Sequence, residues 1–151
     1  MALVYIGLGT NLGNKEQNLK NAIQELTNEV GNVTCQSGFY LSKPWGFQSD
    51  NQFLNAVISL DTNFSAFDLL AKTQQIENEI GRTAKTTDVY ADRVIDIDIL
   101  FYDNEIIDTP KLKIPHPFIL ERDFVYVPLL EIAPDLKHQT SGKKIREMIG
   151  L

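Results

Sequence analysis

The sequence predicts an α+β protein: a ferredoxin-like β-α-β-β-α-β sandwich with a mainly antiparallel sheet and a C-terminal extension. Strand and helix patterns follow one another in that order along residues 3–102. Two successive strands in the middle of the order indicate an antiparallel hairpin. The 151 residues, 43% of them hydrophobic, are enough for one core, so a single domain over residues 1–151 is expected.

The first half of the chain provides one helix and three strands. Residues 3–8 are apolar and predict a buried strand that enters the glycine turn GLGTNLGN. Residues 15–30 carry apolar side chains at helical spacing, and Gly31 stands where a C′ glycine is expected. Residues 33–41 and 53–61 predict two strands, separated by a loop that contains proline and glycine.

The second half continues with a helix over residues 65–80, ended by Gly81. A polar loop, residues 82–92, leads into the next strand. The remaining sequence contains several prolines, and short helices are expected near residues 124–131 and 143–149.

The strand DRVIDIDILFY, residues 92–102, carries two carboxylates inside an apolar run. Side chains alternate between the faces of a strand, so one core face is predicted to hold Ile95, Ile97, Ile99 and Phe101. Asp96 and Asp98 share the other face, with Cα atoms roughly 7 Å apart, and can converge on one cation. Mg²⁺ is often held by one or two carboxylates together with substrate phosphates. The alternative is an exposed face on which aspartate, a poor strand former, is tolerated.

Charge and composition exclude several classes of partner. The net charge of −6 and the pI of about 4.8 argue against a nucleic-acid or anionic-membrane surface. The apolar runs are too short to span a membrane, and the N-terminus lacks the pattern of a signal peptide. The lone Cys35 permits no internal disulfide and suits a reducing compartment. We therefore expect a cytoplasmic monomer that has neither nucleic acid nor membrane as a partner.

Five segments occur in a characteristic order: GLGTNLGN, FLNA, TQQIENEIGR, DRVIDIDIL and IPHPFILERDFVYVPLLEIAPDL. In these segments the chain resembles the 6-hydroxymethyl-7,8-dihydropterin pyrophosphokinases of folate synthesis over nearly its whole length. The Asp-x-Asp strand, followed by Pro-His and then Arg-x-Phe, is the most specific part. The resemblance implies a ferredoxin-like fold and transfer of pyrophosphate from MgATP to the hydroxymethyl group of the pterin, with release of AMP.

The resemblance also implies a set of site residues. The metal ligands are Asp96 and Asp98, which would hold two Mg²⁺ ions, with ATP as co-substrate. The pterin residues are Gly9, Ser42, Lys43, Trp45, Phe53, Asn55 and Phe124. The nucleotide residues are Gln74, Glu77, Arg82, Arg93, Lys111, Lys113, His116 and Arg122. The catalytic residues are Arg82, Arg93, Asp96 and Asp98.

The loop before the Asp-x-Asp strand departs from the family pattern. The family usually has Arg-Trp-Gly-Pro-Arg there, whereas this chain has TAKTTDVYADR. Arg93 matches the last arginine, Tyr90 stands near the usual tryptophan, and Lys85 is the nearest replacement for a missing arginine. This loop is expected to close over the substrates.

Two rival functions remain open from the sequence. One is a non-catalytic, ferredoxin-like module that binds a small molecule, and the other is a different Mg²⁺-dependent phosphotransferase. Formation of AMP together with a pyrophosphorylated pterin separates the pyrophosphokinase from both.

Overall fold

A computed structural model describes residues 1–46, 49, 51–81 and 94–150 of the chain. The strands of its main sheet are β1 (Ala2–Thr10), β2 (Gly31–Gln36), β3 (Tyr40–Ser42), β4 (Phe53–Thr62) and β5 (Asp96–Tyr102). They lie in the order β2-β4-β1-β5, with β3 also on β4, and every pairing is antiparallel. The predicted α+β class with a mainly antiparallel sheet is confirmed.

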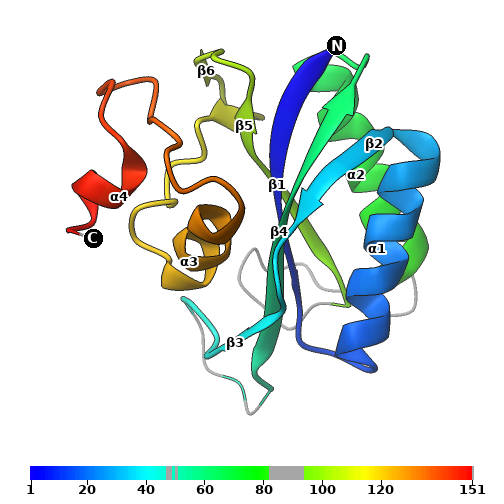
Figure 1. Ribbon diagram of the computed structural model, residues 1–151. Helices are drawn as coiled ribbons and strands as arrows, with labels where there is room; N and C mark the ends of the chain where they lie inside the picture. Colours follow the sequence, from blue (N-terminus) through cyan, green and yellow to red (C-terminus); the bar gives the residue numbers. More distant parts are fainter. Residues whose placement is uncertain (47–48, 50, 82–93, 151) are drawn as a thin grey trace.

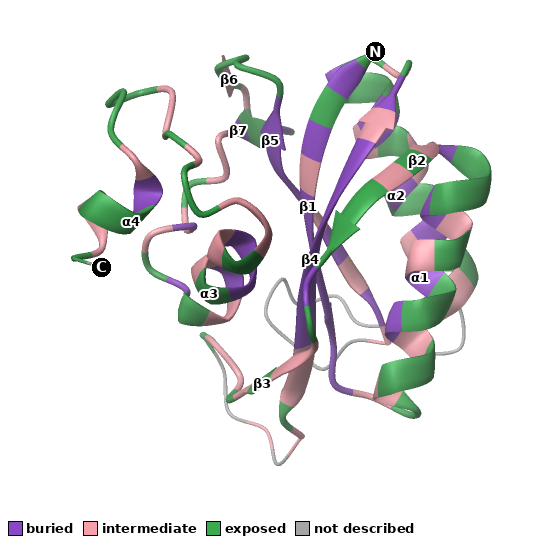
Figure 2. Ribbon diagram, in the orientation of Figure 1, coloured by how far each residue is buried: buried purple, intermediate pink, exposed green. Residues whose placement is uncertain are grey.

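Helices cover both faces of this sheet (Figure 1). The helices are α1 (Lys15–Glu29), α2 (Ala66–Gly81), α3 (Asp123–Ile132) and α4 (Ile145–Met148), and a two-stranded sheet joins β6 (Ile107–Asp108) to β7 (Lys113–Ile114). Figure 1 shows α1 and α2 on one side of the sheet and α3 and α4 on the other. Each side has its own apolar cluster, so the central strands β1, β4 and β5 are buried from both faces, as their largely purple colour in Figure 2 shows.

Helix α1 forms where the sequence predicts it. The Asn14 side chain caps its first turn by accepting the Gln17 N–H at 3.1 Å. Leu19, Ala22 and Leu26 repeat at helical spacing and are fully buried against the sheet. The packing of this stripe therefore fixes which face of α1 meets the sheet.

Gly31 has a different role from the one expected. It follows the C-cap residue Val30 and so stands at C′ as predicted, but it also begins β2 and its φ is not in the left-handed region. A Cβ atom at this position would lie 1.8 Å from the carbonyl oxygen of Asp61 on β4. Glycine is therefore required because two backbones approach closely, not because the helix needs a left-handed residue to end.

The strand predicted over residues 33–41 is interrupted, because β2 ends at Gln36 and β3 begins at Tyr40. Ser37 holds the bend between them. Its backbone N–H donates to the Val57 carbonyl at 2.9 Å, and its side-chain oxygen accepts the Val57 N–H at 2.9 Å. This side chain replaces the regular strand pairing and turns the chain toward α3.

The predicted alternation along β5 is wrong at Phe101. The register with β1 shifts, because Tyr5 pairs with Phe101 while Ile6 pairs with Ile99, which leaves Leu100 as an extra residue. Such a bulge resets the alternation, so Leu100 and Phe101 both pack on the α3 side. The faces of Asp96 and Asp98, which precede the bulge, remain as predicted.

No helix within the described ranges is both long enough and apolar enough to cross a bilayer.

Candidate active site

A cavity of about 340 Å³ lies between the sheet and the segment that leads into α3. Seven of its lining residues are those predicted for the pterin: Gly9, Ser42, Lys43, Trp45, Phe53, Asn55 and Phe124. Four more are predicted metal or nucleotide residues, namely Asp96, Asp98, His116 and Arg122. Residues distant in the sequence thus meet around one space.

Two glycines of the central strand form the floor of the cavity. On β1, Gly9 pairs with Asn55 of β4 on one side and with Asp96 of β5 on the other. Gly7 pairs in the same way with Val57 and Asp98. In each of these two sets of paired residues, the central one is a glycine without a side chain. The cavity therefore extends down to the backbone of β1.

Asp96 and Asp98 stand at the β5 edge of this floor. Both are partly buried and both line the cavity. Between them, the Ile97 N–H donates to Glu77 Oε2 on α2 at 2.8 Å, which ties this strand edge to the helix. Two carboxylates on one strand face, beside glycines that leave room, offer the hard oxygen ligands that Mg²⁺ prefers. The residues present therefore fit a magnesium site.

Three aromatic rings surround the Arg122 guanidinium in another part of the lining, which we call the aromatic wall. The Arg122 guanidinium carbon lies 4.2 Å from the centre of the Trp45 ring and 4.8 Å from that of Phe118. Phe124 follows at 5.9 Å, and the Trp45 and Phe118 rings are themselves 5.2 Å apart. Arg122 is only 9% exposed, so its charge acts in a partly desolvated space.

His116 presents a neutral imidazole to the cavity. Its Nδ1 atom accepts the Phe118 N–H at 3.2 Å, so the proton of the neutral ring is on Nε2. Burial, with a smaller contribution from the Arg122 charge, lowers the pKa of His116 to about 4. At neutral pH the ring is therefore a hydrogen-bond donor without a positive charge.

We expect His116 to make the folded protein less stable as the pH falls. The unfolded chain takes up the proton near pH 6.5 and the folded chain only near pH 4, so acid favours unfolding between these values. Between pH 7.5 and pH 5 the free energy of unfolding should fall by about 2 kcal/mol more in the wild type than in His116→Gln. Urea denaturation of both proteins at the two pH values measures this difference. Equal pH dependence of the two proteins would contradict the assignment.

Four predicted nucleotide residues do not line this cavity. Gln74 is exposed on α2 and borders a separate surface hollow. Glu77 accepts the Ile97 N–H, and Lys113 forms an ion pair with Asp108 at 2.6 Å. Lys111 is exposed just before β7. Their contact with a nucleotide stays a prediction. Arg82, Arg93 and the loop over residues 82–92 lie outside the described residues.

Several lining residues were missing from the predicted set: Gly7, Leu8, Ala56, Val57, Pro117, Phe118 and Val125. Strand alternation carried a signal for two of them, because Gly7 shares a face with Gly9 and Val57 with Asn55. The position of Phe118 depends on how the chain folds after His116, for which the sequence has no periodic signal.

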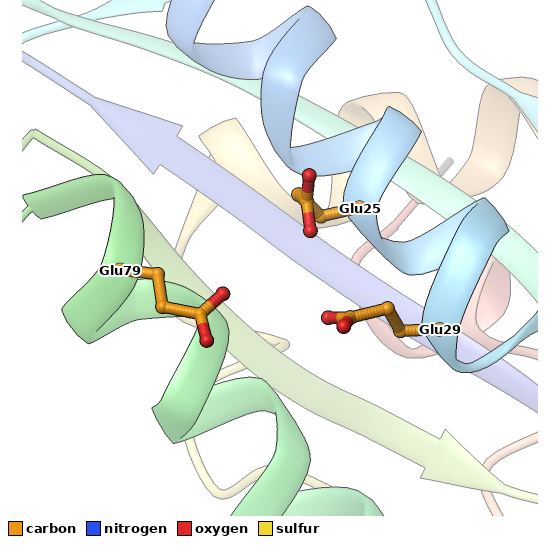
Figure 3. A group of neighbouring side chains, drawn as sticks. All are labelled: Glu25, Glu29 and Glu79. Atoms are coloured by element: carbon orange, nitrogen blue, oxygen red, sulfur yellow. The ribbon is translucent and has the colours of Figure 1, made fainter.

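Acidic side chains also gather elsewhere in the described part of the chain. Glu25 and Glu29 of α1 face Glu79 of α2 (Figure 3). Lys72 Nζ lies 3.6 Å from a Glu29 oxygen, and the Gln75 side-chain amide donates to Glu79 at 3.1 Å. Glu29 and Glu79 are exposed and Glu25 is only partly buried, so the cluster belongs to the solvated surface between the two helices.

The cavity brings two aspartates and several aromatic side chains around one space, an arrangement that suits the class of metal-dependent group transferases with planar substrates. More specifically, the chain belongs to the 7,8-dihydro-6-hydroxymethylpterin-pyrophosphokinase (HPPK) family, whose pattern matches residues 5–134. It is accordingly an ATP-dependent pyrophosphokinase by family.

Curated relatives support this membership over most of the chain. The 2-amino-4-hydroxy-6-hydroxymethyldihydropteridine pyrophosphokinase of Porphyromonas gingivalis is 46% identical over 136 residues, which cover 89% of this chain and 92% of the relative. The enzyme of the same name from Aquifex aeolicus is 42% identical, with coverage of 97% and 90%.

Solved structures show the same fold. The crystal structure of Plasmodium falciparum HPPK-DHPS wild type with STZ-DHP superposes with a TM-score of 0.77 at 15% sequence identity, covering 99% of this chain. A triple mutant of that protein with SDX-DHP gives a TM-score of 0.80, also at 15% identity and 99% coverage of this chain. This chain spans 43% and 41% of the lengths of those two chains.

Proposed function

We propose that this chain transfers pyrophosphate from MgATP to the hydroxymethyl group of 6-hydroxymethyl-7,8-dihydropterin in folate biosynthesis, releasing AMP and the pterin diphosphate. One observation carries the proposal: the paired aspartates and the residues expected to hold a pterin line a single cavity. The family match and the names of the curated relatives support the same activity. The rival, non-catalytic module has no comparable support.

The chemistry is an in-line displacement at the β-phosphorus. The attacking pterin hydroxyl and the leaving oxygen must lie on opposite sides of that atom, so catalysis is mainly positioning and charge neutralisation. Asp96 and Asp98 would hold magnesium, for which we propose two ions. When bound, magnesium neutralises phosphate charge and polarises the reacting oxygens. The two carboxylates would hold the ions at the β5 edge of the cavity floor formed by Gly7 and Gly9.

The remaining lining residues would hold the two substrates. Phe53 and Phe124 offer ring faces for a planar bicyclic ligand, and Asn55 offers a hydrogen bond from the floor. His116 would donate from Nε2 to a phosphate oxygen, and Arg122 would supply a cation. The roles of Gln74, Glu77, Arg82, Arg93, Lys111 and Lys113 toward the nucleotide are carried over from the family resemblance.

The test of this function is the identity of the products. Incubation with MgATP and the pterin alcohol should give AMP and a pyrophosphorylated pterin in equal amounts, and AMP should not form when the pterin alcohol is omitted. Formation of ADP instead would indicate a different phosphotransferase. Pterin binding without any turnover would indicate the binding module.

We expect Phe124→Ala to weaken pterin binding more than ATP binding. Loss of one stacking face should cost on the order of 1–3 kcal/mol, by analogy with bases stacked on aromatic side chains. Titration calorimetry with each ligand measures the two affinities. Phe67→Ala is the matched control, because Phe67 is 47% exposed on α2, outside the cavity lining. An unchanged pterin affinity in Phe124→Ala would count against this wall of the pocket.

Further properties are proposed together with this function. Residues 1–151 form one domain, and the protein is a cytoplasmic monomer. The strand order β2-β4-β1-β5, with α1 and α2 as the two crossover helices on one face, supports a ferredoxin-like topology for the main sheet.

A further inference from the structure

Glu131, near the C-terminal end of α3, is bonded to the bend between β2 and β3. The Gly38 N–H donates to its two carboxylate oxygens at 3.2 and 3.0 Å, and the Tyr40 hydroxyl donates to Oε1. This hydrogen bond raises the pKa of Tyr40, so the hydroxyl stays a donor at neutral pH. An exposed carboxylate therefore joins two segments that lie more than 90 residues apart in the sequence.

Tyr40 connects Glu131 to Asn55, which lines the cavity beside Gly9. Its backbone carbonyl accepts from Asn55 Nδ2 at 3.0 Å, and the Ser42 hydroxyl oxygen accepts from the same nitrogen at 2.8 Å. A carbonyl oxygen can only accept, so the Asn55 atom that faces Tyr40 must be the amide nitrogen. Both amide protons are thus engaged within the protein.

The only side-chain atom of Asn55 that remains for a hydrogen bond to a ligand is therefore the acceptor Oδ1. Its Oδ1 atom lies over the floor, 3.3 Å from the position that a Cβ atom of Gly9 would occupy. With both amide protons engaged, Asn55 offers the cavity an acceptor and no donor. It therefore favours a ligand edge that carries N–H groups over one that carries only acceptors.

We propose that Glu131 is a positioning residue for pterin recognition: through Tyr40 it fixes the orientation of the Asn55 amide, and it holds the α3 wall of the cavity against the β3 wall. The inference rests on the proposed function. Glu131 itself does not line the cavity, so it acts through residues that do. Phe124 and Arg122 are at the start of the helix that Glu131 anchors, and Ser42 is at the end of the strand that Tyr40 begins.

The affinity test uses two variants and a control. Glu131→Gln removes one acceptor oxygen and the charge, and Tyr40→Phe removes one donor. Each should weaken binding of the pterin alcohol about tenfold, which corresponds to ~1.4 kcal/mol, in the presence of a non-hydrolysable ATP analogue. Affinity for the ATP analogue alone should change less than about twofold. Glu16→Gln, an exposed glutamate paired with Lys20 on α1, is the matched control and should leave both affinities unchanged.

A second measurement reads the Asn55 amide directly, in protein without ligand. In the wild type its Nδ2 protons should exchange slowly with water, and in Tyr40→Phe and Glu131→Gln they should exchange several-fold faster by nuclear magnetic resonance. If Glu131→Gln does not fold, Tyr40→Phe alone decides both measurements.

The outcomes separate this inference from the function itself. Three results would each overturn the positioning role of Glu131. They are an unchanged pterin affinity in both variants, an equal loss of pterin and ATP affinity, and an unchanged exchange rate of the Asn55 amide protons. Absence of pterin-dependent AMP formation in the wild type would instead overturn the proposed function.

Discussion

Replacing Asp96 or Asp98 by asparagine is expected to abolish pyrophosphoryl transfer while the chain stays folded. Asparagine keeps the size of the side chain but loses the charge that holds a magnesium ion. Each change should lower kcat by roughly 10³-fold or more, since several kcal/mol of transition-state stabilisation are lost. Initial rates of AMP formation over a range of Mg²⁺ concentrations measure the effect.

The matched control is Asp68→Asn, which makes the same chemical change in the first turn of α2, away from the cavity. This variant should keep wild-type activity. Circular dichroism should show all three variants folded. If wild-type activity persists in excess EDTA, the assignment of the two aspartates as metal ligands is wrong.

Gly31→Ala is expected to lower the free energy of unfolding more than alanine at Gly7 or Gly9, the other two glycines in the strands of the main sheet. The added Cβ atom would lie 1.8 Å from the Asp61 carbonyl oxygen and 2.9 Å from its carbonyl carbon, so β2 and β4 must separate locally. Breaking that pairing should cost about 4 kcal/mol or more, in the range that marks exceptional mutations. Urea denaturation followed by circular dichroism measures the change.

Gly81→Ala is the control for this substitution. Among the described residues, the atom nearest to a Cβ added at Gly81 is Val94 Cβ at 3.7 Å, which is an ordinary contact. Alanine also favours the helical conformation of α2. The control should therefore be as stable as the wild type or slightly more stable. A similar stability for both variants would show that β2 can shift away from β4 at little cost.

The sequence predicts those parts of the fold that depend on local periodicity. The stripe of Leu19, Ala22 and Leu26 was sufficient for α1, and the alternation along β5 was sufficient to place Asp96 and Asp98 on one face. Strand alternation and the family resemblance also selected residues that the fold brings together around one cavity. The resemblance, rather than composition, selected Trp45, Phe124 and Arg122, but it did not include Phe118.

The features that escaped prediction depend on partners far away in the chain. The bulge at Leu100 arises from the pairing of β5 with β1, and the need for glycine at position 31 arises from Asp61. Glu131 appears from the sequence to be an ordinary exposed helix residue, and its contacts with Gly38 and Tyr40 exist only in the folded chain. Periodicity describes one element at a time and cannot report such contacts.

The central position of β1 has a consequence for synthesis on the ribosome. β1 is made before the other strands of its sheet, and its partners on both sides come much later, since Ala2 pairs with Thr62 and Gly9 pairs with Asp96. At about 5–20 residues per second, the nascent chain exposes this apolar strand for several seconds before either neighbour can cover it. Sheets that pair distant segments also fold slowly. A chaperone that binds short apolar segments is therefore expected to engage β1 during translation and to release it when β4 and β5 have emerged.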